Sequence, residues 1–332
     1  MPVRTPRKGG DGRADSLAAI VEALEFALPW LDRLYDPDDE VLVVAVGEEQ
    51  RLVSDLLAEV PGLDLAKLRR AHRRAVVTLS DENDLEATVA VTSFWDHFEY
   101  WILLEGWRDI PVQAQQAFAK GYLDLGIERL SPAIDDVRAG RPVGDPTGND
   151  CFVLLAEAEK IVCDAHRVYV RPCMCRRIYQ RCDKPVDVCL WLEDEDRGAD
   201  MEISRERALE LLAEADRAGL MFTANDPQTD RATWICCCCS DCCQPILAAE
   251  RLGVTGIWPR RRYLATLDAD RCTRCRTCVK RCPFGALTME GKGKSAVLRL
   301  ETSECRGCGV CSTACAGGAI AMMTRSAELG SP

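Results

Sequence analysis

The spacing of apolar residues predicts helices and then a hairpin in the first part of the chain. Residues 16–34 carry apolar positions at helical spacing, and the apolar run 41–46 fits either a buried strand or part of a buried helix. Asp64 is placed to cap a helix that begins at Leu65 and ends near Val76. Residues 78–94 have apolar segments on both sides of a polar turn, which is typical of two paired strands. Helices followed by a hairpin predict a winged-helix-like unit.

Aromatic residues dominate the next helical stretch, residues 92–138. Six of them lie between positions 94 and 107, namely Phe94, Trp95, Phe98, Tyr100, Trp101 and Trp107. This density favours a packed helical core over a surface for stacking a cofactor. Residues 139–150 are rich in Gly, Pro and Asp and predict a linker, with a domain boundary near residue 148. Cys151 and Cys163 flank an apolar run that predicts a helix, on which both would be buried structural thiols.

Composition and charge narrow the class of protein. The 332 residues are 47% hydrophobic and 29% charged, which excludes long-range disorder. A formal net charge of −11 disfavours nucleic acid and anionic lipid as partners of the whole molecule. No apolar stretch is long enough to predict a membrane span, and the basic start lacks the pattern of a signal peptide, so we expect a cytoplasmic protein.

Cysteine is the anomaly in this composition. The chain has 20 cysteines, and all of them lie between Cys151 and Cys315. Thiols stay reduced in the cytoplasm, so such a count indicates metal or redox chemistry instead of a disulfide scaffold.

Two cysteine runs near the carboxyl end share the spacing C-x2-C-x2-C-x3-C. The first consists of Cys272, Cys275, Cys278 and Cys282, with Pro283 after it. The second consists of Cys305, Cys308, Cys311 and Cys315, with Ala316 in the place of a second proline. Zinc sites made of four cysteines usually use two widely separated C-x2-C pairs, so this spacing favours iron–sulfur ligation over zinc.

These runs resemble the bacterial two-cluster ferredoxin module. The resemblance implies two 4Fe-4S clusters, with the fourth cysteine of each run crossing to the other cluster. One cluster would take Cys272, Cys275, Cys278 and Cys315, and the other Cys305, Cys308, Cys311 and Cys282.

Residues 263–325 contain ten Lys or Arg against five Asp or Glu, an excess of positive charge that suits anionic clusters. Lys280, Arg281, Arg274 and Arg306 would stabilise the reduced state.

A second field of cysteines lies upstream of these runs. Cys173, Cys175, Cys182 and Cys189 form one block, and six more follow in the stretch 236–243, namely Cys236, Cys237, Cys238, Cys239, Cys242 and Cys243. Adjacent side chains in the run 236–243 cannot all point the same way. Some of these cysteines must therefore face a second metal centre or serve only in packing. Metal ligation explains the field better than packing does, because crowded thiols are prone to oxidation.

The motifs CMCR, CDKPVDVCL and GIWPRRRY, with the clustered run, resemble a group of cysteine-rich 4Fe-4S binding proteins to which no reaction is assigned. The resemblance spans roughly residues 90–325, and the run departs from the usual pattern at Cys237. We expect at least one additional iron–sulfur cluster here, with zinc or no metal as the alternatives. Its candidate ligands are Cys173, Cys175, Cys182, Cys189, Cys236, Cys238, Cys239, Cys242 and Cys243.

The predicted organisation is therefore multidomain and α+β. The segments are a mainly helical, winged-helix-like region (1–91), an aromatic helical segment with a linker (92–148), a cysteine-rich middle domain (149–262), a dicluster ferredoxin-type domain (263–325) and a tail (326–332). The second boundary is expected within residues 253–263, which are rich in Gly, Pro and Arg.

We interpret the chain as an iron–sulfur electron carrier or oxidoreductase subunit that passes single electrons from a donor to a partner enzyme. No catalytic residue is assigned, and no phosphate-binding or dinucleotide-binding motif is present. One alternative is a reductase, or a reductive activator, that works at an upstream cluster with only three cysteine ligands. Another is a redox-sensing DNA-binding regulator with a basic recognition helix that carries Lys67, Arg69, Arg70, Arg73 and Arg74. Binding to nucleic acid conflicts with the overall negative charge.

Overall fold

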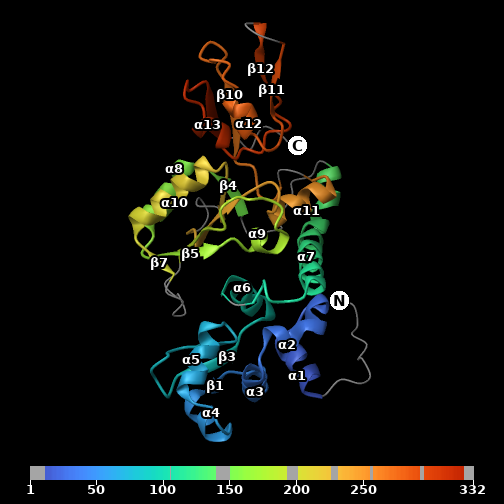
Figure 1. Ribbon diagram of the computed structural model, residues 1–332, viewed down its shortest axis with the longest axis vertical. Coiled ribbons are helices and arrows are strands. Elements are labelled where there is room, and N and C mark those ends of the chain that lie inside the picture. Colours follow the sequence, from blue (N-terminus) through green and yellow to red (C-terminus); the bar gives the residue numbers. More distant parts are fainter. Residues whose placement is uncertain are drawn as a thin grey trace. The chain divides into compact units, whose positions relative to one another are not determined.

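The computed structural model describes residues 12–104, 106–139, 150–192, 201–225, 231–254, 257–291 and 295–324 (Figure 1). Helices and strands are mixed throughout, which confirms the α+β class. The described residues form two compact units, one ending at Ala119 and the other beginning at Lys120. The expected boundary near residue 148, nearly all of the predicted linker and the tail 326–332 lie outside the described residues. None of the described helices is long and apolar enough to cross a membrane.

The first unit consists of short helices around a small sheet. The helices are α1 (Gly12–Ile20), the 3-10 helix η1 (Glu25–Trp30), α2 (Leu31–Leu34), α3 (Pro37–Val46), α4 (Val53–Glu59), α5 (Leu65–Arg73) and α6 (Phe94–Leu104). The strands β1 (Arg51–Leu52), β2 (Val77–Leu79) and β3 (Thr88–Val91) form an antiparallel sheet in the order β1-β3-β2. The hairpin predicted after α5 is therefore confirmed.

Local sequence signals explain where these helices begin and end. The Asp64 side chain accepts a hydrogen bond from the backbone N–H of Lys67 at 2.8 Å, which confirms the predicted cap of α5. The apolar run 41–46 belongs to helix α3, which begins with Pro37 in its first turn. The helical spacing of residues 16–34 is divided among α1, η1 and α2, because Glu22 adopts a left-handed φ of 53° after α1 and Pro29 lies within η1.

Helix α6 and the first part of α7 (Val112–Arg138) supply an aromatic core, as the sequence predicts. The rings of Phe94 and Phe98 stack at 5.5 Å between centroids, and those of Phe98 and Phe118 stack at 4.9 Å. His97 is fully buried beside them, and its ring nitrogens lie 2.9 Å from the carbonyl oxygens of Arg74 and Leu34. His97 therefore contacts two backbone carbonyls within the core, which fits a packing role.

A six-stranded antiparallel sheet forms the centre of the second unit. Its strand order is β4-β8-β9-β6-β5-β7, with β4 (Asp150–Val153), β5 (Val168–Pro172), β6 (Asp187–Trp191), β7 (Glu202–Ile203), β8 (Met221–Asn225) and β9 (Trp234–Cys238). Helices α8 (Leu155–Asp164) and α10 (Arg205–Arg217) pack with the sheet around one apolar core. Two further helices begin next to cysteines, α9 (Met174–Tyr179) after Cys173 and α11 (Gln244–Leu252) after Cys243.

The two isolated cysteines do not lie as the sequence predicts. Cys151 is buried, but in strand β4 and not on a helix. Cys163 lies on helix α8 as expected, but it is exposed. The apolar face of α8 is formed by Ala158 and Val162, so the helix turns Cys163 towards solvent.

The carboxyl-terminal cysteine runs lie between two short antiparallel pairs of strands. Strand β10 (Tyr263–Leu267) pairs with β13 (Ile320–Thr324), and β11 (Leu287–Glu290) pairs with β12 (Val297–Leu300). The short helices α12 (Thr277–Arg281) and α13 (Val310–Thr313) each carry a cysteine from one run. Asp216 of α10 holds this segment against the rest of the unit, because it accepts hydrogen bonds from Arg281 at 3.2 Å and from Thr313 at 2.7 Å.

Candidate iron–sulfur and metal centres

The two C-x2-C-x2-C runs fold into the same loop. Arg274 and Arg276 in the first run adopt left-handed φ values of 60° and 63°, and Gly307 and Gly309 at the matching positions of the second run adopt 74° and 80°. Left-handed residues on both sides of the middle cysteine turn the chain sharply twice. The shared spacing of the two runs therefore corresponds to a shared backbone path around three thiols.

One cavity beside the cysteine runs has a volume of about 330 Å³. Its apolar wall includes Met289, Leu298 and Ile320 from strands β11, β12 and β13. Its cysteines are Cys272, Cys275, Cys278 and Cys315. Three of these come from the first run, and the fourth is the last cysteine of the second run.

The second cavity, of about 310 Å³, is built in the same way. Ala265, Leu287 and Leu300 contribute to its wall. Its cysteines are Cys282, Cys305, Cys308 and Cys311. Each cavity is thus lined by three cysteines of one run and the last cysteine of the other, and all eight cysteines of the two runs are accounted for.

The thiols of the two cavities differ in their surroundings. Cys275 is exposed, and hydrogen bonds from the Thr277 hydroxyl and backbone N–H lower its pKa to about 7. Cys308 is buried, and this burial raises its pKa. The backbone N–H of Ala319 donates to Sγ of Cys315 at 3.2 Å. The first cavity therefore has an exposed thiol, whereas the thiol at the matching position of the second cavity is buried.

The basic residues expected to favour a reduced state are mostly engaged elsewhere. Arg281 pairs with Asp216, and the Arg274 side chain donates to the carbonyl oxygen of Ala296 at 3.0 Å. Arg306 lies 3.7 Å from a carboxylate oxygen of Glu304 and over the ring of Phe284. Lys280 is exposed. Several of these side chains thus hold the cysteine-containing loops in place, and Arg281 holds its loop against helix α10.

Six upstream thiols form a closed group, which we call the six-thiol ring. Neighbouring thiols of this group shift one another's pKa, in the order Cys175, Cys173, Cys189, Cys236, Cys238 and Cys243. The two ends, Cys175 and Cys243, also interact electrostatically. Cys189 lies in strand β6, Cys236 and Cys238 lie in β9, and the other three members lie at the starts of helices α9 and α11.

Two members of the ring accept hydrogen bonds and thereby favour the thiolate form. Hydrogen bonds from Cys175 and Cys189 hold the pKa of Cys173 well below its usual range. Hydrogen bonds from Cys236 and Cys243 do the same for the pKa of Cys238, whose Sγ also lies 3.5 Å from the Thr223 hydroxyl. Thiolates are the form that binds metal, so the ring is suited to ligation.

A buried arginine, Arg176, lies beside the ring. It is 3% exposed, and its Nη1 donates to the carbonyl oxygen of Cys237 at 2.7 Å. Burial alone would lower its pKa, but the neighbouring Cys173 and Cys189 raise the pKa by more. Nε and Nη2 find no hydrogen-bond acceptor among the described residues. A buried guanidinium with donors to spare fits an anionic group among these thiols.

Strand β9 separates the remaining thiols from the ring. Cys237 is fully buried in the apolar core, and its thiol donates to the carbonyl oxygen of Val188 at 3.0 Å. Cys239 and Cys242 belong to the same core and meet Cys182 there. The Sγ atom of Cys182 lies 3.7 Å from that of Cys239 and 3.8 Å from that of Cys242. The nine upstream candidates are thus divided into six in the ring and three in a separate group.

An apolar contact connects the six-thiol ring with the second cavity. Cys238 and Cys243 of the ring and Cys308 of the cavity belong to one buried cluster. Phe152, Met221, Ile246 and Val310 complete the cluster. The ring and the second cavity are therefore neighbours within the second unit, with buried side chains between them.

Sequence reasoning missed the two most informative polar residues here. Arg176 follows Cys175 within the CMCR motif, so its position in the motif could have identified it. Asp216 gives no such signal, because it is one of several acidic residues on helix α10. Only the fold shows that it joins the helix to the cysteine-rich loops.

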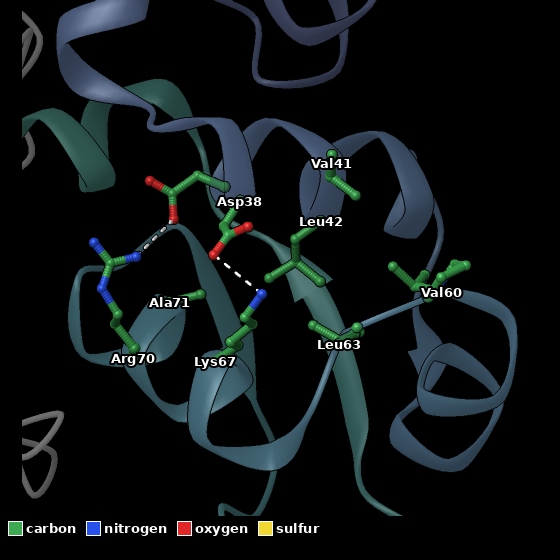
Figure 2. Close-up of a pocket in the computed structure, with 11 residues that line it drawn as sticks. Asp38, Val41, Leu42, Val60, Leu63, Lys67, Arg70 and Ala71 are labelled. Atoms are coloured by element: carbon green, nitrogen blue, oxygen red, sulfur yellow. Dashed lines mark ion pairs between the residues drawn. The ribbon is translucent and has the colours of Figure 1, made fainter.

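The basic helix α5 is largely paired with acidic residues of its own unit. Figure 2 shows a pocket of about 410 Å³ between α3 and α5, in which Lys67 lies 3.2 Å from Asp38. Arg70 pairs with Asp36 at 2.7 Å, and Arg74 pairs with Asp39, whose side chain is 1% exposed. Arg69 donates to the carbonyl oxygen of Glu82 at 2.9 Å. Arg73 is exposed.

Comparison with known proteins agrees with the cavities. Residues 271–320 match the family model of the 4Fe-4S dicluster domain. No curated protein and no solved structure matches the chain. The match covers both cysteine runs, so the chain contains a 4Fe-4S domain, and its cysteine-rich sites indicate iron–sulfur electron transfer.

Proposed function

We propose that the protein carries single electrons between a donor and a partner oxidoreductase through two 4Fe-4S clusters held in the two cavities. Cys272, Cys275, Cys278 and Cys315 would ligate one cluster, and Cys282, Cys305, Cys308 and Cys311 the other. The observation that carries this proposal is the exchange of the last cysteine between the runs, which supplies four thiols to each cavity. When bound, such a cluster takes up and releases one electron at a time.

Substitution of one cysteine in each cavity tests the ligand sets. Cys275→Ala and Cys311→Ala are each expected to lose about four iron and about four sulfide ions per chain after anaerobic purification, and to retain the other cluster. Cys163→Ala is the matched control, because Cys163 is an exposed thiol on helix α8, and it should lose nothing. If neither variant differs from the wild type in iron and sulfide content, the proposal fails.

We extend the proposal to an additional iron–sulfur cluster in the six-thiol ring. The thiolate-favouring hydrogen bonds at Cys173 and Cys238 and the spare donors of Arg176 support an anionic cluster there. The buried cluster that joins Cys308 to Cys238 and Cys243 supports electron exchange between this centre and the second cavity. In this account the exposed first cavity meets the donor, and the electrons then move inward.

The route can be tested by redox titration with electron paramagnetic resonance. In the wild type, we expect the signals of the reduced centres to show mutual magnetic coupling because the centres are neighbours. Cys243→Ala should remove the upstream signal and simplify the signal of the second cavity, with no change in the signal of the first. Unchanged signals from both cavities would contradict the proposed contact.

The order of elements in the first unit, α3-β1-α4-α5-β2-β3 with sheet order β1-β3-β2, supports a winged-helix-like unit. The ion pairs of Lys67, Arg70 and Arg74 with the start of α3 favour a structural role for the basic helix over DNA binding. We therefore expect the full-length protein to pass through heparin and duplex-DNA columns at low salt. Retention that weakens as salt rises would instead favour the regulator.

A further inference from the structure

Three upstream thiols are spaced for one metal ion. Sγ of Cys182 lies 3.7 Å from Sγ of Cys239 and 3.8 Å from Sγ of Cys242, and all three atoms lie within 4.8 Å of one another. Thiolates around a tetrahedral ion with metal–sulfur bonds of about 2.3 Å are separated by about 3.8 Å. The three thiols therefore already have the spacing of ligands that share a single ion.

The corners of a cubane need a wider spacing, because each thiolate binds a different iron. Within the described ranges, no other three His, Cys, Asp or Glu ligand atoms lie within 4.8 Å of one another. All four cysteines of each ferredoxin-type cavity are described. Their sulfur atoms thus lie farther apart than those of Cys182, Cys239 and Cys242. No three sulfur atoms of the six-thiol ring, all of whose residues are described, come within 4.8 Å of one another either.

The surroundings of this group also suit a bound cation. Cys239 and Cys242 are 1% and 0% exposed, whereas Cys182 is half-buried and lies in the loop after α9. The backbone N–H groups of Cys242 and Arg181 donate to the sulfurs of Cys239 and Cys242, respectively. Such donors orient thiolate ligands and offset the charge that remains when three thiolates bind one divalent ion.

We propose that Cys182, Cys239 and Cys242 bind one Zn²⁺ ion, separate from the iron–sulfur centres. Zinc is preferred over ferrous iron because it binds a given ligand set more tightly and accepts a tetrahedral set of thiolates. The site lies on the opposite face of strand β9 from the six-thiol ring, so the crowded run of cysteines serves two centres of different chemistry. This inference does not depend on the function proposed above.

Metal and sulfide analysis of a single variant tests the site. We expect the wild type to contain one Zn²⁺ per chain and Cys182→Ala to lose it, while iron and acid-labile sulfide stay unchanged. Cys182 is chosen because its half-buried loop position tolerates substitution better than Cys239 or Cys242. Cys163→Ala is the control and should keep the zinc. A fall in sulfide together with iron in Cys182→Ala would overturn the proposal, because these cysteines would then be corners of a cluster.

X-ray absorption at the zinc edge of the wild-type protein is a second test that does not need a folded variant. The expected spectrum has three sulfur neighbours at about 2.3 Å and one lighter ligand at about 2.0 to 2.2 Å. A wild type without zinc, or zinc without sulfur neighbours, would contradict the site. Failure of this test would leave the iron and sulfide content of the cavities as predicted, so the two proposals can be told apart.

Discussion

Cys237 and Cys238 are adjacent on strand β9, yet their thiols lie on opposite faces of the sheet. Cys237 is fully buried in the apolar core and donates to the carbonyl oxygen of Val188, whereas Cys238 accepts hydrogen bonds within the six-thiol ring. The alternation of side chains along a strand produces this division. One residue therefore packs, and its neighbour is a candidate ligand.

This pair gives a matched test of the six-thiol ring. Cys238→Ala is expected to lose the iron of the upstream cluster, whereas Cys237→Ala should keep all the iron. The second variant should be destabilised by about 1 kcal/mol, because it loses a small buried side chain and one hydrogen bond. Iron content and urea unfolding of both proteins measure these outcomes. Equal iron in the two variants would contradict the ring.

The exchange of cysteines between the runs predicts which variants resemble one another. Cys315→Ala should lose the signal of the same cluster as Cys278→Ala, although Cys315 belongs to the other run. Cys282→Ala should in turn match Cys308→Ala. Electron paramagnetic resonance of the reduced proteins distinguishes the two clusters. If Cys315→Ala instead resembled Cys308→Ala, each run would hold its own cluster.

The second loop favours glycine at position 309. A Cβ atom there would lie 2.7 Å from Cδ2 of Leu154, and φ is 80°. Gly309→Ala should therefore cost at least about 1 to 2 kcal/mol and loosen the second cluster first. Thermal bleaching of the cluster absorption measures this loss. The matched change Arg276→Gly in the first loop should alter stability by no more than about 1 kcal/mol, because glycine suits the left-handed conformation there.

Asp216 should control how firmly the cysteine-rich loops are held against helix α10. Asp216→Ala removes the carboxylate acceptor of both Arg281 and Thr313, while Arg281 keeps its bond to the backbone carbonyl oxygen of residue 216; hydrogen bonds to a charged group each contribute about 1.5 to 3 kcal/mol. We expect faster proteolysis after residue 253 and slower electron exchange with the upstream cluster, with both ferredoxin-type clusters retained. Thr313→Val, which removes only the neutral partner, should have a smaller effect. Equal proteolysis rates for Asp216→Ala and wild type would contradict this docking role.

Patterns local in sequence predicted much of this protein. The cap at Asp64, the hairpin after α5 and the aromatic packing around Phe98 all follow from short-range signals. The position of Cys151 did not, because an apolar run of that length fits a strand as well as a helix. The break after α1 depends on a left-handed Glu22, which its residue type does not announce.

The candidate metal centres, too, could be predicted only as far as local sequence patterns define them. The spacing of the two runs indicated their ligand type, and the strand alternation in 234–238 could have separated Cys237 from its neighbours. The meeting of Cys182 with Cys239 and Cys242 joins residues 57 and 60 positions apart. Such a contact is set by how β6 and β9 pair in the sheet, and spacing along the chain does not contain it.

Iron and acid-labile sulfide analysis of the anaerobically purified wild type tests the central claim most directly. The account predicts iron and sulfide in about equal amounts, with at least about eight of each for the two ferredoxin-type cavities and more from the six-thiol ring. Electron paramagnetic resonance after dithionite reduction should then show interacting clusters. A colourless protein with zinc in the two cavities and no inorganic sulfide would contradict the account.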